Sequence, residues 1–484
     1  MGLMSERMSK VDTAWLRMDT EANLMMIVGV WSIRPGITLT ALRERVAERL
    51  LQYPRFRQKV VEDALLGAQW VADRDFDIAR HVIAEVALPL RGQSRDAVLR
   101  ERVAELCSQP LDPGHPLWQF QLIEDMGDGS SALIARIHHC IADGIALIAV
   151  MLSITDGGQA PPKRTPRAEP NEPAETDWLL DAFLRPMTNM TVKAIGMTGK
   201  GVAKGMDLAL GARSPMALPV DSSLEMARLG YQAVSDVAAF ALMPDDSPTR
   251  LKGKPGAKKT VAWADSLALD EVKAVGKALG ASINDVLLAC AAGAIGRYLA
   301  DKGEDPAGKE IRAMVPVNLR PLEQAWQLGN RFGLVPLVLP IGIANPVERL
   351  FAVRARMNEL KGSFQPVMAF GLLSVAGLLI KPVQHAMLNI FAKKATAVMT
   401  NVPGPAEALK FCGSTVEQVM FWVPQSGDIG LGLSILTYAG RVQFGLITDA
   451  GLCPDPQAII DNFAPEFEKL LLLSLMMPWE GEAA

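Results

Sequence analysis

The spacing of hydrophobic residues predicts two amphipathic helices in the N-terminal part of the chain. In each of them apolar residues recur three or four positions apart, so that they share one face of a helix. We expect Asp96 to cap the second helix, because short acidic side chains are favoured at helix N-termini. The apolar positions are Leu39, Leu42, Val46 and Leu50 in the first helix, and Leu99, Val103 and Leu106 in the second.

Two strands and a third helix are predicted next. The segment WQFQLIED alternates, with Trp118, Phe120 and Leu122 on one face, as in a strand that packs on a core. The segment SALIARI is almost continuously apolar and is typical of a buried strand. It leads into the short segment HHCIADG, and the apolar run IALIAVMLSI after that predicts a helix. The pattern is therefore strand, turn and helix.

The second half of the chain mixes helices and strands. One predicted helix carries Val272, Val275 and Leu279 on one face and ends at Gly280. Another begins at Ser282 and runs to about residue 300. Strands are predicted in KTVAWADSL, IRAMVPVNL, GLGLSILTYAG and RVQFGLITD. This mixed order is not a strict βαβ repeat and predicts an α+β fold with mixed-sheet domains.

A proline-rich, polar segment at residues 156–176 separates the two halves and is not suited to a packed element. A chain of 484 residues is also too long for one hydrophobic core. We therefore predict an N-terminal domain (1–155), a linker with a helical crossover (156–255) and a C-terminal domain (256–484).

Composition narrows the class of protein. The chain is 49% hydrophobic and 21% charged, as in folded globular proteins, and its net charge of -4 argues against nucleic acid as a partner. The five cysteines lie far apart without a CxxC pair, which argues against a disulfide framework and a thiolate zinc site. We expect a reducing, cytoplasmic location.

No targeting or membrane-spanning segment is predicted. The N-terminus MGLMSERMSKVDTAW lacks the apolar stretch of a secretory signal. The longest strongly apolar run, Ala369 to Ile380, is too short to cross a bilayer. We therefore expect a protein that is neither secreted nor membrane-spanning.

The segment HHCIADG concentrates candidate chemistry: His138, His139, Asp143 and Gly144 lie at the end of a buried strand. Such a position aims side chains into a crevice, and Asp143-Gly144 is suited to capping the following helix. If the turn is helical, His139 and Asp143 share one face. Two other interpretations stay open: histidines that only fill the core or cap a helix, and a metal site. Adjacent side chains in extended structure point to opposite faces and make poor joint ligands, so the metal site is the weaker of the two.

The pattern HHxxxDG resembles the signature of the coenzyme A-dependent acyltransferase superfamily, which includes chloramphenicol acetyltransferase, plant acyltransferases and peptide-synthetase condensation domains. Further segments are similar to the bacterial wax ester synthase/diacylglycerol acyltransferase family. The opening DTAWLRMD also resembles that family, although Trp15 stands where the family more often has Phe, and Met25-Met26 where it more often has Met-His. The other segments are PLDPGHPLW, SINDVLLA, RAMVPVNLR, LGNRFGLVPLVLPIG, NVPGP and YAGRVQFGLITD.

The resemblance implies two chloramphenicol-acetyltransferase-like domains, each a mixed β-sheet flanked by helices, with the active site at their interface. It implies transfer of a fatty acyl group from acyl-CoA to diacylglycerol, a long-chain alcohol, or both, with no bound cofactor. In this sequence the general base is then His139. A neutral imidazole takes the hydroxyl proton as the oxygen attacks the thioester, so no covalent acyl-enzyme is needed.

Roles for the remaining residues follow from the resemblance. Asp143 is expected to be a structural residue paired with a basic side chain, with a triad role as the alternative. Asn284 lies in SxxD, which is also a plain capping pattern, and its amide is a candidate for stabilising an oxyanion. We expect substrate contacts from Gly144, Trp118, Ala369, Phe370 and Gly371.

A basic tract precedes the C-terminal half. It is either a solvated loop or a contact for coenzyme A phosphates or anionic lipid heads. Its residues are Arg250, Lys252, Lys254, Lys258 and Lys259, of which Lys254, Lys258 and Lys259 are the candidates for binding CoA.

Water-insoluble substrates predict an exposed apolar patch. The candidate is the apolar segment of residues 364–394; the alternative interpretation of this segment is a pair of core helices. We expect a cytoplasmic protein held peripherally at the inner membrane face or at lipid inclusions; the sequence leaves the oligomeric state open, a homodimer included. The competing functions are a condensation-type or secondary-metabolite acyltransferase and a catalytically silent, lipid-droplet-associated lipid-binding protein. The intact motif argues against the silent protein.

Overall fold

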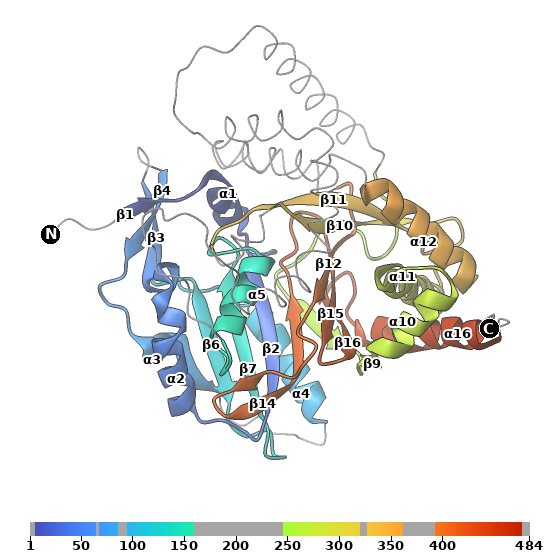
Figure 1. Cartoon of the computed structure of the whole chain (residues 1–484). Coiled ribbons are helices and arrows are strands. Elements are labelled where there is room, and N and C mark those ends of the chain that lie inside the picture. The colour runs from blue at the N-terminus through green and yellow to red at the C-terminus, as the bar shows by residue number, and fades with distance from the viewer. Residues whose placement is uncertain are drawn as a thin grey trace, which may run out of the picture.

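A computed structural model describes residues 5–63, 67–85, 94–158, 245–319, 327–361 and 393–476. Two lobes lie side by side, each built on a mixed β-sheet with helices packed against it (Figure 1). This arrangement confirms the predicted α+β fold with two mixed sheets. Most of the proline-rich segment, from residue 159 onward, and the residues Ala369, Phe370 and Gly371 lie outside the described residues.

The N-terminal lobe is built around β2 (Met26–Arg34) and β7 (Ser131–His138), which pair antiparallel. Every residue of β7 is buried, as its apolar sequence predicts, because both faces of this central strand are covered. The sheet order is β13-β14-β2-β7-β6-β5. Its other strands are β5 (Val82–Glu85), β6 (Trp118–Ile123), β13 (Lys410–Phe411) and β14 (Ser414–Trp422).

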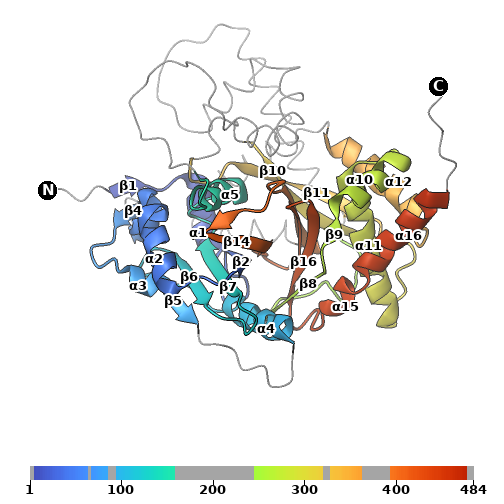
Figure 2. The same cartoon turned by 60° about the horizontal axis from the view of Figure 1, so that its bottom comes forward.

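Two strands of this sheet come from the C-terminal part of the chain. β14 pairs antiparallel with β2 over nearly its whole length, with one register shift between Val416 and Gln418. Figure 2 shows β14 beside β2, within the lobe that the N-terminal half builds. The division of the chain in space therefore differs from a division by residue number, and the two lobes are interlocked.

The C-terminal lobe has the sheet order β11-β10-β12-β15-β16-β8, with β9 paired to β16. Its helices cover the outer face of this sheet (Figures 1 and 2). The strands are β8 (Lys259–Trp263), β9 (Leu267–Ala268), β10 (Ile311–Asn318), β11 (Phe332–Leu339), β12 (Ala397–Pro403), β15 (Leu431–Tyr438) and β16 (Arg441–Asp449). The helices are α10 (Leu269–Ala278), α11 (Ile283–Asp301), α12 (Pro346–Lys361), α15 (Gln457–Ile460) and α16 (Phe463–Met476).

The helix α11 forms the centre of the C-terminal lobe. Ser282 caps it as predicted, and the side chains of Ser282 and Asp285 bond each other's backbone N–H groups in a capping box. By length and composition α11 is apolar enough to cross a membrane, but 78% of its apolar window is buried inside the protein. It is therefore the core helix of this lobe.

The N-terminal lobe carries helices α1 (Lys10–Met18), α2 (Leu39–Glu48), α3 (Ile78–His81), α4 (Arg95–Cys107) and α5 (Gly144–Ser153), two 3₁₀ turns (Leu50–Gln52 and Pro54–Arg57), and a small sheet of β1 (Ser5–Arg7), β3 (Gln58–Asp63) and β4 (Gly67–Ala72). The predicted cap of α4 was wrong by two positions. Ser94, not Asp96, occupies the N-cap, because its hydroxyl accepts the N–H of Ala97 at 3.2 Å. Asp96 lies in the first turn, where a negative charge complements the helix dipole.

Candidate functional site

The segment HHCIADG forms the turn between β7 and α5, at the boundary of the two lobes. The backbone N–H of His139 donates to the carbonyl of Met25 at 2.7 Å, which fixes the residue just beyond the strand. The turn between the two elements is not helical. Asp143 caps α5 by accepting the N–H of Ala146 at 2.9 Å, as its sequence position predicts.

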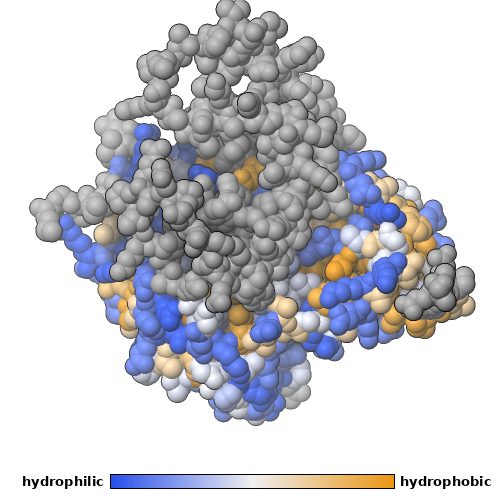
Figure 3. Space-filling model, in the orientation of Figure 1, coloured by the Kyte–Doolittle hydropathy of each residue, from blue (hydrophilic) through white to orange (hydrophobic). Residues whose placement is uncertain are grey.

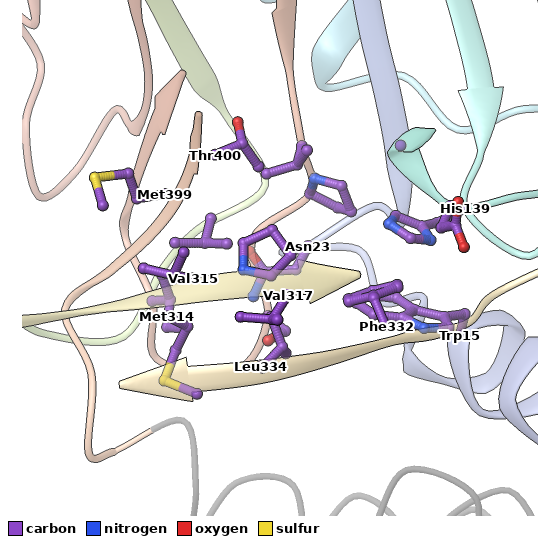
Figure 4. Close-up of a pocket in the computed structure, with 18 of the residues that line it drawn as sticks. Trp15, Asn23, His139, Met314, Val315, Val317, Phe332, Leu334, Met399 and Thr400 are labelled. Carbon is purple, nitrogen blue, oxygen red and sulfur yellow. The ribbon is translucent and has the colours of Figure 1, made fainter. Parts of the chain in front are cut away.

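His139 lies at one end of a cavity of about 540 Å³ between the lobes. Its ring stacks on Trp15 of α1, with ring centroids 4.1 Å apart and ring planes 14° apart. The ring centroid of Phe332 of β11 lies 5.5 Å from that of His139. Figure 4 shows these three rings together, with Met314 and Met399 farther along the cavity. Strands β10, β11 and β12 supply apolar side chains to this wall, among them Leu334. The site therefore combines one imidazole with an apolar chamber.

Burial controls the protonation of His139. Enclosure by protein lowers the pKa of His139 to about 4, and the backbone carbonyl of His139 and the Asn330 side chain oppose this shift only in part. Within the described residues, Nδ1 is buried without a hydrogen-bond partner. Nε2 is then the ring nitrogen with access to the cavity that His139 lines. The ring is a neutral base at physiological pH.

His138 does not line this cavity. Its Nδ1 accepts the backbone N–H of Cys140 at 3.1 Å, and its Nε2 lies 3.8 Å from Oδ1 of Asp19. The same Asp19 oxygen accepts the N–H of Met25 at 2.6 Å, and Met25 in turn holds the backbone of His139. These contacts hold the turn, and His138 is not placed to touch a substrate in the cavity.

Asp143 is 2% exposed, and its carboxylate bonds backbone groups on both sides. One oxygen caps α5, and Oδ2 accepts the N–H of Arg331 at 2.9 Å. These are the contacts of a structural residue that joins the motif turn to the chain segment before β11. Gly144, at the start of α5, lines the cavity, and a Cβ there would meet no described atom within 4 Å. Glycine thus widens the cavity beside His139.

The segment 328–332 docks against the motif turn. The N–H of Gly329 donates to the carbonyl of Ile141 at 3.2 Å, and the N–H of Asp143 donates to the carbonyl of Gly329 at 3.3 Å. Gly329 adopts a φ of 109°, a conformation that favours glycine. A Cβ at this position would lie 3.5 Å from Oδ2 of Asp12 and 3.4 Å from the Arg55 guanidinium.

Sequence reasoning missed the roles of Asp12, Asn330, Trp15 and Phe332. Oδ1 of Asp12 accepts the backbone N–H and the side-chain amide of Asn330, at 2.9 and 2.8 Å, and Oδ2 of Asp12 forms an ion pair with Arg55 at 3.2 Å. The sequence contains a signal, because Asp12 and Trp15 lie in DTAWLRMD, and Asn330 and Phe332 lie in LGNRFGLVPLVLPIG. Nothing in the local pattern showed that they meet.

Asn284 lies in the first turn of α11, on the cavity wall that the C-terminal lobe supplies. Its Oδ1 accepts the side-chain N–H of Asn401 at 2.8 Å. Among described residues its own NH₂ group has no acceptor, so this group is available as a donor to a ligand in the cavity that Asn284 lines.

Two expected contacts are not supported by the structure. Trp118 is 1% exposed, stacks on His81 and donates from Nε1 to the carbonyl of Phe56 at 2.9 Å, so it is a core residue and does not line the cavity. Lys259 is 5% exposed, and its ammonium group lies 3.4 Å from Asp449. Burial lowers the pKa of Lys259, and the paired carboxylate opposes that shift. Lys259 therefore ties the lobe together.

The other two candidate lysines are exposed. Lys254 lines the cavity, whereas Lys258 does not. The candidates Ala369, Phe370 and Gly371 lie outside the described residues. In the described ranges, no group of three or more His, Cys, Asp and Glu side chains is placed to hold a metal ion.

Comparison with known proteins adds to this geometry. The chain resembles "Probable diacyglycerol O-acyltransferase tgs1" of Mycobacterium tuberculosis (strain ATCC 25618 / H37Rv), with 26% identity over 96% of both chains. The structure of the present chain is similar to that of the wax ester synthase/diacylglycerol acyltransferase from Marinobacter aquaeolei VT8. The TM-score is 0.63 and the identity 20%, with coverage of 96% of this chain and 98% of that one. The trichothecene 15-O-acetyltransferase of Fusarium sporotrichioides shares the fold, with a TM-score of 0.57, 13% identity and coverage of 96% and 95%.

Two family models together match most of the sequence. The model for the WS/DGAT C-terminal domain matches residues 328–471. The model for the wax ester synthase/diacylglycerol acyltransferase catalytic domain matches residues 8–287, more than half of the chain, and includes both the motif turn and Asn284. The chain belongs to the wax ester synthase/diacylglycerol acyltransferase family.

Proposed function

We propose that this protein transfers a fatty acyl group from acyl-CoA to the hydroxyl of diacylglycerol, a long-chain alcohol, or both, with His139 as the general base. The product is triacylglycerol or a wax ester. The observation that carries the proposal is a neutral imidazole that opens onto an apolar cavity between two lobes. Family membership supports an O-acyltransferase, and the apolar walls favour lipid chains as ligands.

The reaction follows from proton transfer at one atom. Nε2 of His139 takes the hydroxyl proton as the alcohol oxygen forms a bond to the thioester carbon. The Asn284 amide is the proposed donor to the oxyanion. When the carbon–sulfur bond breaks, the imidazolium returns the proton to the departing thiolate. Asp143 and His138 hold the turn and take no proton in this scheme.

Removal of the base tests the proposal directly. We expect His139→Ala to lower kcat by about 10²- to 10⁴-fold with palmitoyl-CoA and either dioleoylglycerol or hexadecanol, because the alcohol then lacks a base. Product lipid and free thiol are measured together. His115→Ala is the matched control, since His115 lies outside the cavity against Asp73. Equal rates for His139→Ala and wild type on both acceptors would contradict the assignment, and absence of thiol release with every protein would favour the silent lipid-binding protein.

The pH dependence tests the environment of His139. Only the neutral ring is a base, so kcat/KM falls as pH falls through the pKa of His139 in the free enzyme. With a pKa of about 4, the wild type keeps nearly its full rate at about pH 5.5, where a base with an ordinary pKa of about 6.5 retains roughly a tenth. Product lipid is quantified at each pH, and circular dichroism checks that the protein stays folded. A midpoint between about pH 6 and 7 would contradict a buried, neutral base.

The exposed Lys254 is the proposed contact for the coenzyme A phosphates, because it is the one described residue of the candidate lysine set that lines the cavity. We expect Lys254→Met to raise the KM for palmitoyl-CoA about twofold to fivefold, as for one solvent-exposed ion pair, with kcat nearly unchanged. The effect should shrink as salt is added. Lys273→Met, which removes an exposed lysine of α10 that does not line the cavity, is the control. An unchanged KM in Lys254→Met would remove Lys254 from the binding site.

We also propose peripheral attachment to the inner membrane face or lipid inclusions. Exposed apolar residues at the end of α16 support this proposal; Leu472 is 61% exposed, Leu475 56% and Met476 82%. Figure 3 shows hydrophobic surface at this end of the molecule, where α16 ends in Figure 1. Burial of such apolar side chains in a lipid interface lowers the free energy of the system.

Vesicle binding tests this attachment. We expect the double variant Leu472→Ser, Leu475→Ser to co-sediment with phosphatidylcholine vesicles several-fold less than wild type, because two apolar anchors are lost. Turnover of a short-chain, water-soluble thioester and alcohol should change little, since α16 does not line the cavity. Lys273→Ser provides a matched surface change. Equal sedimentation of the double variant and wild type would assign attachment to another part of the chain.

A further inference from the structure

The side-chain amide of Asn330 lies between two groups of the N-terminal lobe. Its Nδ2 donates to Oδ1 of Asp12 at 2.8 Å and to the backbone carbonyl of His139 at 2.8 Å. The backbone N–H of Asn330 donates to the same Asp12 oxygen at 2.9 Å. Asn330 is 4% exposed and Asp12 is fully buried. A residue of the chain segment before β11 thus contacts the residue that carries the base.

These bonds fix which way the amide faces. Both hydrogens of Nδ2 are used, and both partners are oxygen atoms. The flipped amide would set its carbonyl oxygen against two acceptors, so it is excluded by the hydrogen-bond chemistry. Oδ1 of Asn330 is then the atom left over. It is buried without a partner among the described residues, and so is Nδ1 of His139.

Two unsatisfied buried atoms of complementary kind, on residues already joined by a hydrogen bond, suggest a third contact. An amide oxygen accepts hydrogen bonds, and Nδ1 of a neutral imidazole donates one in the tautomer that leaves Nε2 unprotonated. A buried polar atom without a partner is costly, which favours formation of this bond. Hydrogen bonds of catalytic groups also tighten when substrates bind.

We propose that Asn330 is a positioning residue for His139: its Oδ1 accepts the Nδ1–H of the imidazole and so keeps the lone pair on Nε2, toward the cavity. Asp12 holds the Asn330 amide in the orientation that this requires, and Arg55 holds Asp12 through a contact of 3.2 Å. This inference rests on the proposed function of His139 as a base and adds the group that selects its tautomer.

Electrostatics agrees with this geometry. The Asn330 side chain acts on the ring in the direction that raises the pKa of His139, although burial lowers that pKa more strongly. The backbone carbonyl of His139 is the competing acceptor for Nδ1–H, and it raises the pKa of His139 more strongly than Asn330 does. Asn330 donates to that carbonyl and thereby engages one of its lone pairs. The test must therefore separate the two acceptors.

The experiment reads the tautomer directly. Full-length protein labelled with ¹⁵N-histidine gives nitrogen chemical shifts that distinguish protonated from unprotonated ring nitrogens, and comparison with His139→Gln assigns the His139 signals. We expect wild type to hold the proton on Nδ1, and Asn330→Ala to show a mixture with the Nε2–H tautomer. We also expect kcat to fall about 10- to 100-fold, with the KM for palmitoyl-CoA changed less than about twofold, because binding of the substrate does not depend on the tautomer.

Further variants separate positioning from stability. Asp12→Ala should shift the tautomer in the same direction, since the Asn330 amide loses its anchor. Asn345→Ala removes a capping asparagine of α12 that does not line the cavity, so it lowers the melting temperature and leaves the tautomer and kcat as in wild type. If Asn330→Ala does not fold, the Asp12→Ala spectrum decides the question.

The outcomes distinguish this inference from the proposed function. An Nδ1–H tautomer and a normal kcat in Asn330→Ala would assign the proton to the carbonyl of His139 and overturn the role of Asn330, while loss of activity in His139→Gln would leave the base in place. Full activity in His139→Gln would overturn the proposed function, whatever the tautomer. A kcat loss in Asn330→Ala without any tautomer change would reduce Asn330 to a structural residue and also overturn the inference.

Discussion

Two buried carboxylates hold the lobes together at the site. Asp12 binds the backbone and side chain of Asn330, and Asp143 binds the backbone of Arg331, so one short segment is gripped from two sides. Carboxylates are costly to bury unless hydrogen bonds satisfy them, and here the bonds come from a segment that leads into the other lobe's sheet. The position of that segment, of Phe332 behind it and of the cavity wall on β11 all depend on these contacts.

The same docking explains the surroundings of His139, the proposed base. Once the segment is seated, Phe332 and Trp15 enclose the His139 ring and remove it from water. Removal from water lowers the pKa of His139, which keeps the ring unprotonated but makes it a weak base. A weak base suffices if the developing oxyanion stands beside the imidazolium, because each charge then stabilises the other. Accurate placement of the alcohol and the thioester supplies the rest of the rate.

The fold was largely predictable from the sequence, because its elements have strong local signals. The nearly continuous apolar run of β7 and the capping box of α11 each specify an element from neighbouring residues. Insertion of β14 into the first sheet was not predictable, since nothing near residue 414 indicates its pairing with β2. The burial of Lys259 was not predictable for the same reason, because its basic neighbours are local whereas its partner Asp449 lies 190 positions away.

The site residues likewise divide into those that local sequence predicts and those that depend on long-range contacts. His138, His139, Asp143 and Gly144 were found because one turn holds them all, and a turn is a local structure. Asn330 and Asp12 lie 318 positions apart, and each has an ordinary local explanation. Asp12 is an acidic residue in the first turn of α1, and Asn330 is a loop residue. Their contact, and with it their role at the site, exists only when both lobes are folded against each other. The proposed base has surroundings that come from both lobes, so its site is assembled by folding of the whole chain. Substitutions far from His139 in sequence can therefore change its chemistry without touching the cavity.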